Sequence, residues 1–217
     1  MTPCLIAMRS STASPERQRL VALLRQEPRG SANRQREQIQ GLIASLEQQS
    51  PADLSAPGAE ALLEGVWELR WSSSAQPYLA VAPWLENLQC LAPSQGRGMN
   101  LLRLPGPWSA VAGIAVEAAI AVATKQQADA AAAPVQRVQV QFQRGGWIGP
   151  RLGDGRLQWL RRVNQSFPAW LDITVLDPEL RICRGNAGTL FALLRRSDLS
   201  LQELLLPQSS GSGIISG

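Results

Sequence analysis

Near the N-terminus, apolar residues recur at helical spacing and follow a typical helix start. Residues 14–16 (Ser-Pro-Glu) supply a capping side chain, a proline at the first helical position and an acid in the first turn. After a break at residues 28–30, Ser31 is expected to cap a second helix. The apolar positions are Leu20, Val21, Leu23 and Leu24 in the first segment and Ile39, Leu42, Ile43 and Leu46 in the second. This pattern predicts a helical hairpin over residues 14–49, which either packs on the rest of the domain or binds a partner protein.

Beyond a linker at residues 51–58, the pattern changes from helical to alternating. Apolar and polar residues alternate most clearly at residues 66–71 and 138–142, as in half-buried strands. Further strands are expected at residues 100–104, 116–124, 170–176, 180–184 and 189–195, and a loop at the alanine tract 130–133. Turn sequences at residues 177–179 and 185–188 separate the last three strands, which predicts an antiparallel meander.

Strands joined by short links, without alternating helices, predict a mainly β protein. The expected architecture is an antiparallel β-barrel with an N-terminal helical hairpin. The chain of 217 residues is long enough for one such domain with a sizeable core. We expect a flexible N-terminus at residues 1–13, the hairpin and linker at 14–58, the barrel at 59–197, and a short amphipathic piece with a flexible tail at 198–217.

The composition excludes several kinds of active site. The chain has no histidine, which removes the commonest general base and the commonest metal ligand, and with them Ser-His-Asp and Cys-His catalytic sites. Cys4, Cys90 and Cys183 are few and far apart, so they predict neither a disulfide framework nor a zinc site, and a reducing compartment suits them best. We expect no metal and no cofactor. The net charge of +4 allows an anionic partner such as acidic lipid headgroups, whereas no basic run with interleaved aromatics indicates nucleic acid.

No segment is expected to cross a membrane or to direct secretion. The most apolar stretch, residues 110–123, is shorter than the roughly 20 residues that a membrane span needs and contains Glu117. The apolar stretch within residues 1–10 is short and precedes its arginine, unlike a secretory signal. The sequence therefore predicts a soluble protein that contacts membranes at most peripherally.

Residues 144–151 are predicted to form a loop that suits a membrane surface. Trp147 and Ile148 stand between glycines, and Arg144 and Arg151 flank them. An aromatic ring can insert at the headgroup layer while the neighbouring cations meet anionic lipids. The alternative is that Trp147 folds back over the mouth of the barrel.

Two segments carry a resemblance to a known family. They are LEGVWEL at residues 63–69 and WLDITVLDPELRICRGNAGTLF at residues 170–191. Together they resemble the plastid lipid-associated protein (PAP), or fibrillin, family, in its cyanobacterial type, over roughly residues 62–195. The resemblance implies a lipocalin-like (calycin) barrel that binds isoprenoids, quinones, carotenoids or other lipids. It also implies a cytoplasmic location at the surface of the thylakoid membrane. Val175 departs from the family, which tends to have tyrosine there.

The Gly-x-Trp element at residues 65–67 has a structural explanation. Glycine lets the chain turn sharply into the first strand, and the indole of Trp67 can then close one end of the barrel. In lipocalins an arginine from the last strand lies over that ring. Arg195 or its neighbour Arg196 is expected to make this contact, which is worth on the order of 0.5 to 2 kcal/mol.

Asp172 and Arg184 lie on strands predicted to pair, and the turn between them decides which residues they face. A two-residue turn places Asp172 and Thr174 on one face with Arg181 and Cys183, whereas a three-residue loop places them with Ile182 and Arg184. The alternation does not choose between these registers. The two residues form a structural charge pair, contact a ligand, or take part in catalysis.

The sequence favours a non-catalytic carrier for an apolar small molecule or lipid, bound peripherally to a photosynthetic membrane. One alternative is a chromophore-handling enzyme on the same scaffold, whose acids would be Asp172, Glu68 and Glu117. The other is a membrane-associated scaffold with a filled barrel. The residues expected to bind the ligand are Trp67, Leu69, Trp71, Val138, Val140, Phe142, Asp172, Thr174, Arg184, Phe191 and Arg195.

Overall fold

A computed structural model describes residues 14–74, 76, 81–123, 134–152, 155–166 and 168–205. The helices are α1 (Pro15–Leu24), α2 (Arg36–Gln49), α3 (Ala59–Leu63) and α4 (Leu201–Leu204), with 3-10 helices at Ser31–Gln35, Pro93–Gln95 and Gly106–Ala110. The strands are β1 (Gly65–Ser72), β2 (Glu86–Ala92), β3 (Arg97–Arg103), β4 (Gly113–Val122), β5 (Arg137–Leu152), β6 (Gly155–Arg162), β7 (Ala169–Leu176), β8 (Leu180–Gly185) and β9 (Leu190–Arg195).

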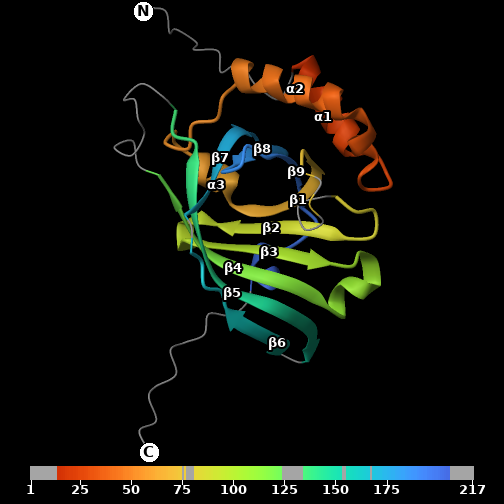
Figure 1. Cartoon of the computed structure of the whole chain (residues 1–217), viewed down its shortest axis with the longest axis vertical. Helices are drawn as coiled ribbons and strands as arrows, with labels where there is room; N and C mark the ends of the chain where they lie inside the picture. The colour runs from red at the N-terminus through yellow and green to blue at the C-terminus, as the bar shows by residue number, and fades with distance from the viewer. Residues whose placement is uncertain are drawn as a thin grey trace, which may run out of the picture.

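Within the described residues, eight antiparallel strands close into a barrel, which confirms the predicted lipocalin-like fold. The sheet runs in the order β4-β3-β2-β1-β9-β8-β7-β5-β6, and the pairing of β4 with β5 closes the ring. β6 pairs only with β5 and lies outside this ring. Figure 1 shows α1 and α2 at the top of the view, the ring of strands below them, and the sheet continuing downward to β5 and β6.

The predicted helical hairpin is present and packs on the barrel. The backbone N–H of Arg17 donates to the Ser14 hydroxyl at 3.2 Å, as expected for a cap. The predicted cap at Ser31 is wrong: its hydroxyl donates to the Pro28 carbonyl, and a short 3-10 helix intervenes before α2 begins at Arg36. The apolar stripes of both helices are buried against the outer side of β8 and β9.

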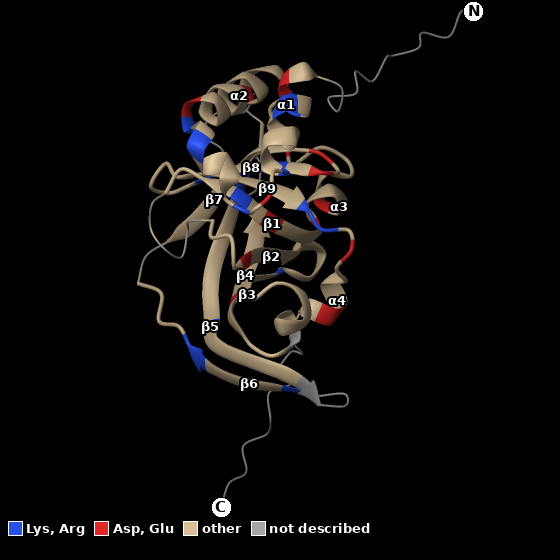
Figure 2. Ribbon diagram, turned by 90° about the vertical axis from the view of Figure 1, so that its right-hand side faces the viewer, with Lys and Arg blue, Asp and Glu red and all other residues tan. Residues whose placement is uncertain are grey.

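Buried ion pairs fix the hairpin to the sheet. Glu68 on β1 and Glu86 on β2 are both buried, and each accepts from Arg29 in the α1–α2 connection and from Arg196 after β9. Burial alone raises the pKa of Glu86, but hydrogen bonds from Arg196 and Arg103 outweigh it and hold that pKa below its usual value. Figure 2 shows that blue and red segments both occur in the region between the hairpin and β9.

The strands agree with the sequence prediction except in three places. β2 and β6 were not predicted, since residues 86–92 and 155–162 mix polar and apolar side chains without a plain alternation. The predicted loop at residues 144–151 is wrong, because this segment is the second part of β5 and pairs with β6. The predictions for residues 1–13, 130–133 and 206–217 lie outside the described residues.

Candidate functional site

Trp67 is buried near the start of β1 and beside α3, the position expected for a residue that closes one end of the barrel. Its side chain is 0% exposed, and its indole N–H donates to the Leu63 carbonyl at 2.9 Å. The guanidinium carbon of Arg195 lies 4.3 Å from the centre of the ring, so Arg195 makes the expected cation–π contact and Arg196 does not. Gly65 has φ +140°, and a side chain there would collide with the Arg195 guanidinium.

The barrel interior behind Trp67 is packed with apolar side chains. Five of the predicted ligand-binding residues meet in this cluster, namely Trp67, Leu69, Val138, Val140 and Phe191. Ile173, Cys183 and Leu193 fill the space among them and are fully buried or nearly so. In this part of the barrel the predicted ligand residues therefore pack against one another.

The prediction that Trp71 lines the interior is wrong. The register between β1 and β9 shifts between Leu69 and Trp71, so the alternation of inward and outward side chains is broken there. Arg70 donates to the Leu24 carbonyl at the end of α1, and Trp71 packs in the cluster formed by the helical hairpin. Both side chains therefore face outward.

The β7–β8 hairpin combines features of the two registers that the sequence left open. A two-residue turn at Pro178–Glu179 joins the strands, but a register shift at Thr174 then brings Asp172 opposite Arg184. Because of this bulge, Asp172 does not contact the interior as predicted. Arg184 does not contact it either, because it shares the outer face of β8 with Leu180 and Ile182 through the regular alternation of that strand. Asp172 pairs with Arg137 at 2.8 Å on the outside, and Arg184 donates to Glu47 of α2 at 2.8 Å.

Thr174 is held by its own bulge. It is buried, its hydroxyl donates to the Ile182 carbonyl at 3.4 Å, and its carbonyl accepts from the N–H of Ala52. These contacts fix the segment before α3 to the barrel. They give Thr174 a structural role, in contrast to the ligand contact that we expected.

A hollow of about 870 Å³ lies in the barrel wall beside β5, at the point where the strand that pairs with β5 changes from β7 to β6. In the described part of the chain, β7 pairs with β5 up to Val140, and β6 pairs with it from Arg144 onward. Ile120, Val140 and Phe142 supply apolar walls of the hollow. The other lining residues are Ala119, Ala121, Arg137, Gln139, Gln141, Val163, Asn164, Gln165, Ser166, Pro168, Ala169 and Trp170.

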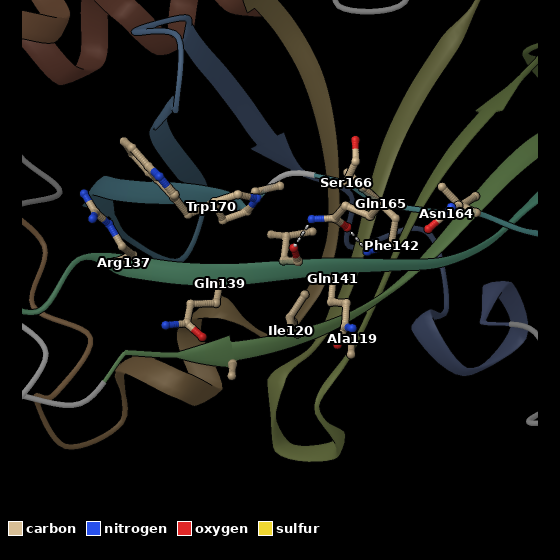
Figure 3. A pocket seen from close by; sticks show the side chains of 15 residues that line it. Ala119, Ile120, Arg137, Gln139, Gln141, Phe142, Asn164, Gln165, Ser166 and Trp170 are labelled. Carbon is tan, nitrogen blue, oxygen red and sulfur yellow. Dashed lines mark hydrogen bonds between the residues drawn. The ribbon is translucent and has the colours of Figure 1, made fainter.

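The side-chain amide of Gln165 occupies the gap between β6 and β7. Its oxygen accepts from the N–H of Phe142 at 2.6 Å, and its nitrogen donates to the Val140 carbonyl at 3.2 Å. Figure 3 shows this amide against the β5 backbone. Gln165 thus replaces a strand at this point, a role that no sequence pattern predicts because a lone glutamine in an irregular segment has no signature.

A row of apolar side chains crosses the sheet from β3 to β6, and all of them are exposed except Leu102, which is partly buried. Leu102, Ile114, Trp147 and Trp159 are register partners from β3 to β6 and share the face that lines the barrel interior. Trp147 is 42% exposed and Trp159 is 66% exposed. We call these four residues the apolar row. Contiguous exposed apolar side chains of this kind mark interaction surfaces.

Two of the other predicted membrane contacts, Ile148 and Arg144, do not join the apolar row. Ile148 is 0% exposed and packs in a cluster with Leu204 of α4 on the opposite face of the sheet, because neighbouring strand residues alternate. Arg144 faces the same way and donates to Glu117 at 2.7 Å. The side chain of Arg151 lies outside the described residues. Of the three predicted contacts whose side chains are described, only Trp147 is exposed as predicted.

The acids considered for catalysis are all held in ion pairs with arginines. Glu68 accepts from Arg29 and Arg196, Glu117 from Arg144, and Asp172 from Arg137. Among the described residues no group of His, Cys, Asp or Glu could hold a metal ion. Nor does any described helix have the length and apolar character that a membrane span requires.

A closed antiparallel barrel with a buried tryptophan and an arginine over its ring defines a lipocalin-like protein. A profile of the PAP_fibrillin family matches residues 15–194, which include both segments that carried the resemblance. The chain belongs to the PAP/fibrillin family. The family and the barrel are consistent with a lipid-associated protein. No curated protein and no solved structure matches the chain.

Proposed function

We propose that the protein is a non-catalytic carrier for an apolar small molecule such as a quinone, a carotenoid or another isoprenoid. The observation that supports this most is the hollow on β5, where Ile120, Val140 and Phe142 form apolar walls. Removing about 300 Å² of ligand surface from water would contribute roughly 7 kcal/mol before ordering costs. Before those costs are subtracted, this corresponds to a dissociation constant of about 10 µM, and it needs no reacting residue.

We also propose that the apolar row meets a membrane and holds the protein peripherally at the thylakoid surface. Trp147 and Trp159 suit the headgroup layer, where an amphipathic ring contacts both lipid and water. Arg161 is exposed next to them, and its guanidinium lies 5.0 Å from the Trp159 ring. A cation at this position would meet anionic headgroups. A carrier whose hollow lies beside such a surface can exchange its ligand with the bilayer.

The packed interior favours a second function, a membrane-associated scaffold. Leu69, Ile173 and Leu193 are almost completely buried, so the centre of the barrel is filled by its own side chains. In this function the hollow on β5 would hold only water. The two functions differ in whether an apolar ligand binds saturably.

Titration of the full chain with a quinone that carries a ten-carbon tail tests the carrier function. Trp170 lies at the hollow, and its fluorescence should be quenched saturably at one site per chain. Val140→Phe should weaken the affinity by about tenfold or more, because the added ring takes volume that the ligand needs. Val111→Phe is the matched control, since Val111 is exposed and does not line the hollow. Quenching that rises linearly without saturation would favour the scaffold.

A further inference from the structure

Arg181 is a fully buried charge inside the barrel. It lies on β8 with 0% exposure, and its guanidinium carbon is 5.2 Å from the centre of the Trp67 ring. Its Nη2 donates to the side-chain oxygen of Gln89, whereas Nε and Nη1 have no hydrogen-bond partner among the residues that the structure describes. Buried polar groups are nearly always satisfied, so these two open donors need an explanation.

No counter-ion compensates this charge in the part of the chain that the structure describes. Arg17, which is also buried, has Asp177 as its partner at 2.7 Å, but no carboxylate stands in that position for Arg181. The neighbouring thiol of Cys183 is fully buried, and burial raises its pKa, so it stays neutral near pH 7. The second cation nearby, Arg195, adds to the positive potential. The site therefore favours a negative charge from outside the chain.

A row of polar side chains connects this guanidinium with solvent. Gln89, which holds Arg181, is partly exposed although it points into the barrel. Its register partner across β2–β3 is Asn100, which is exposed on the same face. Leu102, the first member of the apolar row, is the next residue along β3 that lies on the same face as Asn100. A ligand entering past the apolar row would thus meet Asn100, then Gln89, then Arg181.

We propose that Arg181 binds the carboxylate of an amphiphilic ligand, such as a long-chain fatty acid, whose tail extends toward the apolar row. One guanidinium balances one negative charge, and its planar donors suit a carboxylate. The inference rests on the proposed carrier function, to which it adds the class of headgroup. It also places a second binding position at Arg181, on the side of the barrel interior that Gln89 and Asn100 connect with solvent, and separate from the hollow on β5.

Calorimetric titration of the unmodified full chain tests this with three probes: dodecanoate, its methyl ester, and acetate. Dodecanoate should bind about tenfold or more tightly than the ester, because only the acid carries the charge that Arg181 lacks. Acetate should bind far more weakly than dodecanoate, because it has no tail. Acetate binding as tightly as dodecanoate would overturn the amphiphile in favour of a free small anion. Equal affinities of the acid and the ester would overturn the role of the charge, while the carrier function would stand.

Arg181→Gln and Arg184→Gln form a matched pair of variants. Arg184 lies on the same strand but faces outward to Glu47. Arg181→Gln should remove the preference for the acid over the ester, and Arg184→Gln should keep it. Persistence of the preference in a folded Arg181→Gln protein would refute the assignment. If that variant does not fold, the probes on the wild-type chain still decide. Failure of the acid, the ester and the quinone alike to bind would reject the carrier function together with this inference.

Discussion

The same substitution, Arg→Met, should have opposite effects at two buried arginines. Arg17 on α1 donates to both oxygens of Asp177, at 2.7 and 2.9 Å, and fixes the hairpin to the β7–β8 turn. Arg181 has one acceptor and no carboxylate in the described structure. Methionine preserves the aliphatic stem of arginine and removes the charge. Arg17→Met should therefore destabilise the protein, and Arg181→Met should stabilise it.

The magnitudes follow from what each charge gains inside the protein. Removing Arg17 leaves Asp177 buried without its cation, which typically costs about 3 kcal/mol or more. Burial lowers the pKa of Arg181 to about 10. At roughly 1.4 kcal/mol per tenfold change in proton affinity, its charged form is destabilised by about 3 kcal/mol. Arg181→Met also loses the hydrogen bond to Gln89 and a weak contact with Trp67, so a net gain of about 1 to 2 kcal/mol remains.

Urea unfolding followed by tryptophan fluorescence measures both free energies. Arg184→Met is the control for adding an apolar side chain, and its half-exposed ion pair with Glu47 should be worth less than about 1 kcal/mol. The advantage of Arg181→Met over wild type should shrink as the pH rises above about 10, since the folded wild type then releases a proton that its unfolded chain retains. A loss of stability in Arg181→Met as large as that in Arg17→Met would show that Arg181 has a compensating partner, and the reasoning would be wrong.

Three further predictions concern the closed end, the membrane surface and acid stability. Trp67→Ala should lower the free energy of unfolding by roughly 3 to 5 kcal/mol in the same urea assay, because the ring is fully buried; a wild-type value would contradict its place at the closed end. Trp159→Ser should reduce sedimentation with anionic vesicles more than Trp170→Ser does, and salt should weaken the binding. Equal losses in the two variants would show that the apolar row is not the membrane contact. Hydrogen bonds from Arg17 hold the pKa of Asp177 below its usual value despite burial. The stability that they add is therefore present near pH 7 and is lost as the pH falls through that lowered pKa. The loss of stability in Arg17→Met relative to wild type should shrink in acid, and a loss that stays constant with pH would contradict the pairing.

The sequence predicted the fold well where local patterns match tertiary structure. The Ser-Pro-Glu helix start, the alternation at residues 138–142 and the turns of the final meander report on near neighbours, and each is found in the structure. The contact of Arg195 with Trp67 was also predicted, because it follows from the family of barrels.

The site was harder to predict because register shifts and pairing across the sheet decide it. One extra residue in β1 turned Trp71 outward, and one in β7 carried Asp172 to the outer surface. The signal for β6 was weak because the strand lies outside the ring and both its faces are largely exposed. Arg181 could not be distinguished from a solvated arginine, since its burial results from contacts between β8 and β2 that are distant in sequence.

The hollow and the apolar row have a common origin in the length of β5. This strand has 16 residues and pairs with two strands along the same edge. β7 pairs with its first part and belongs to the closed barrel, and β6 pairs with its second part and extends the sheet. The exchange of partners requires a short stretch that neither strand covers, and Gln165 satisfies the backbone there at Val140 and Phe142. Because both features depend on the same exchange, the hollow lies where the extended sheet begins. A ligand that leaves the membrane at the apolar row would reach the barrel wall at the position where a single glutamine side chain closes it.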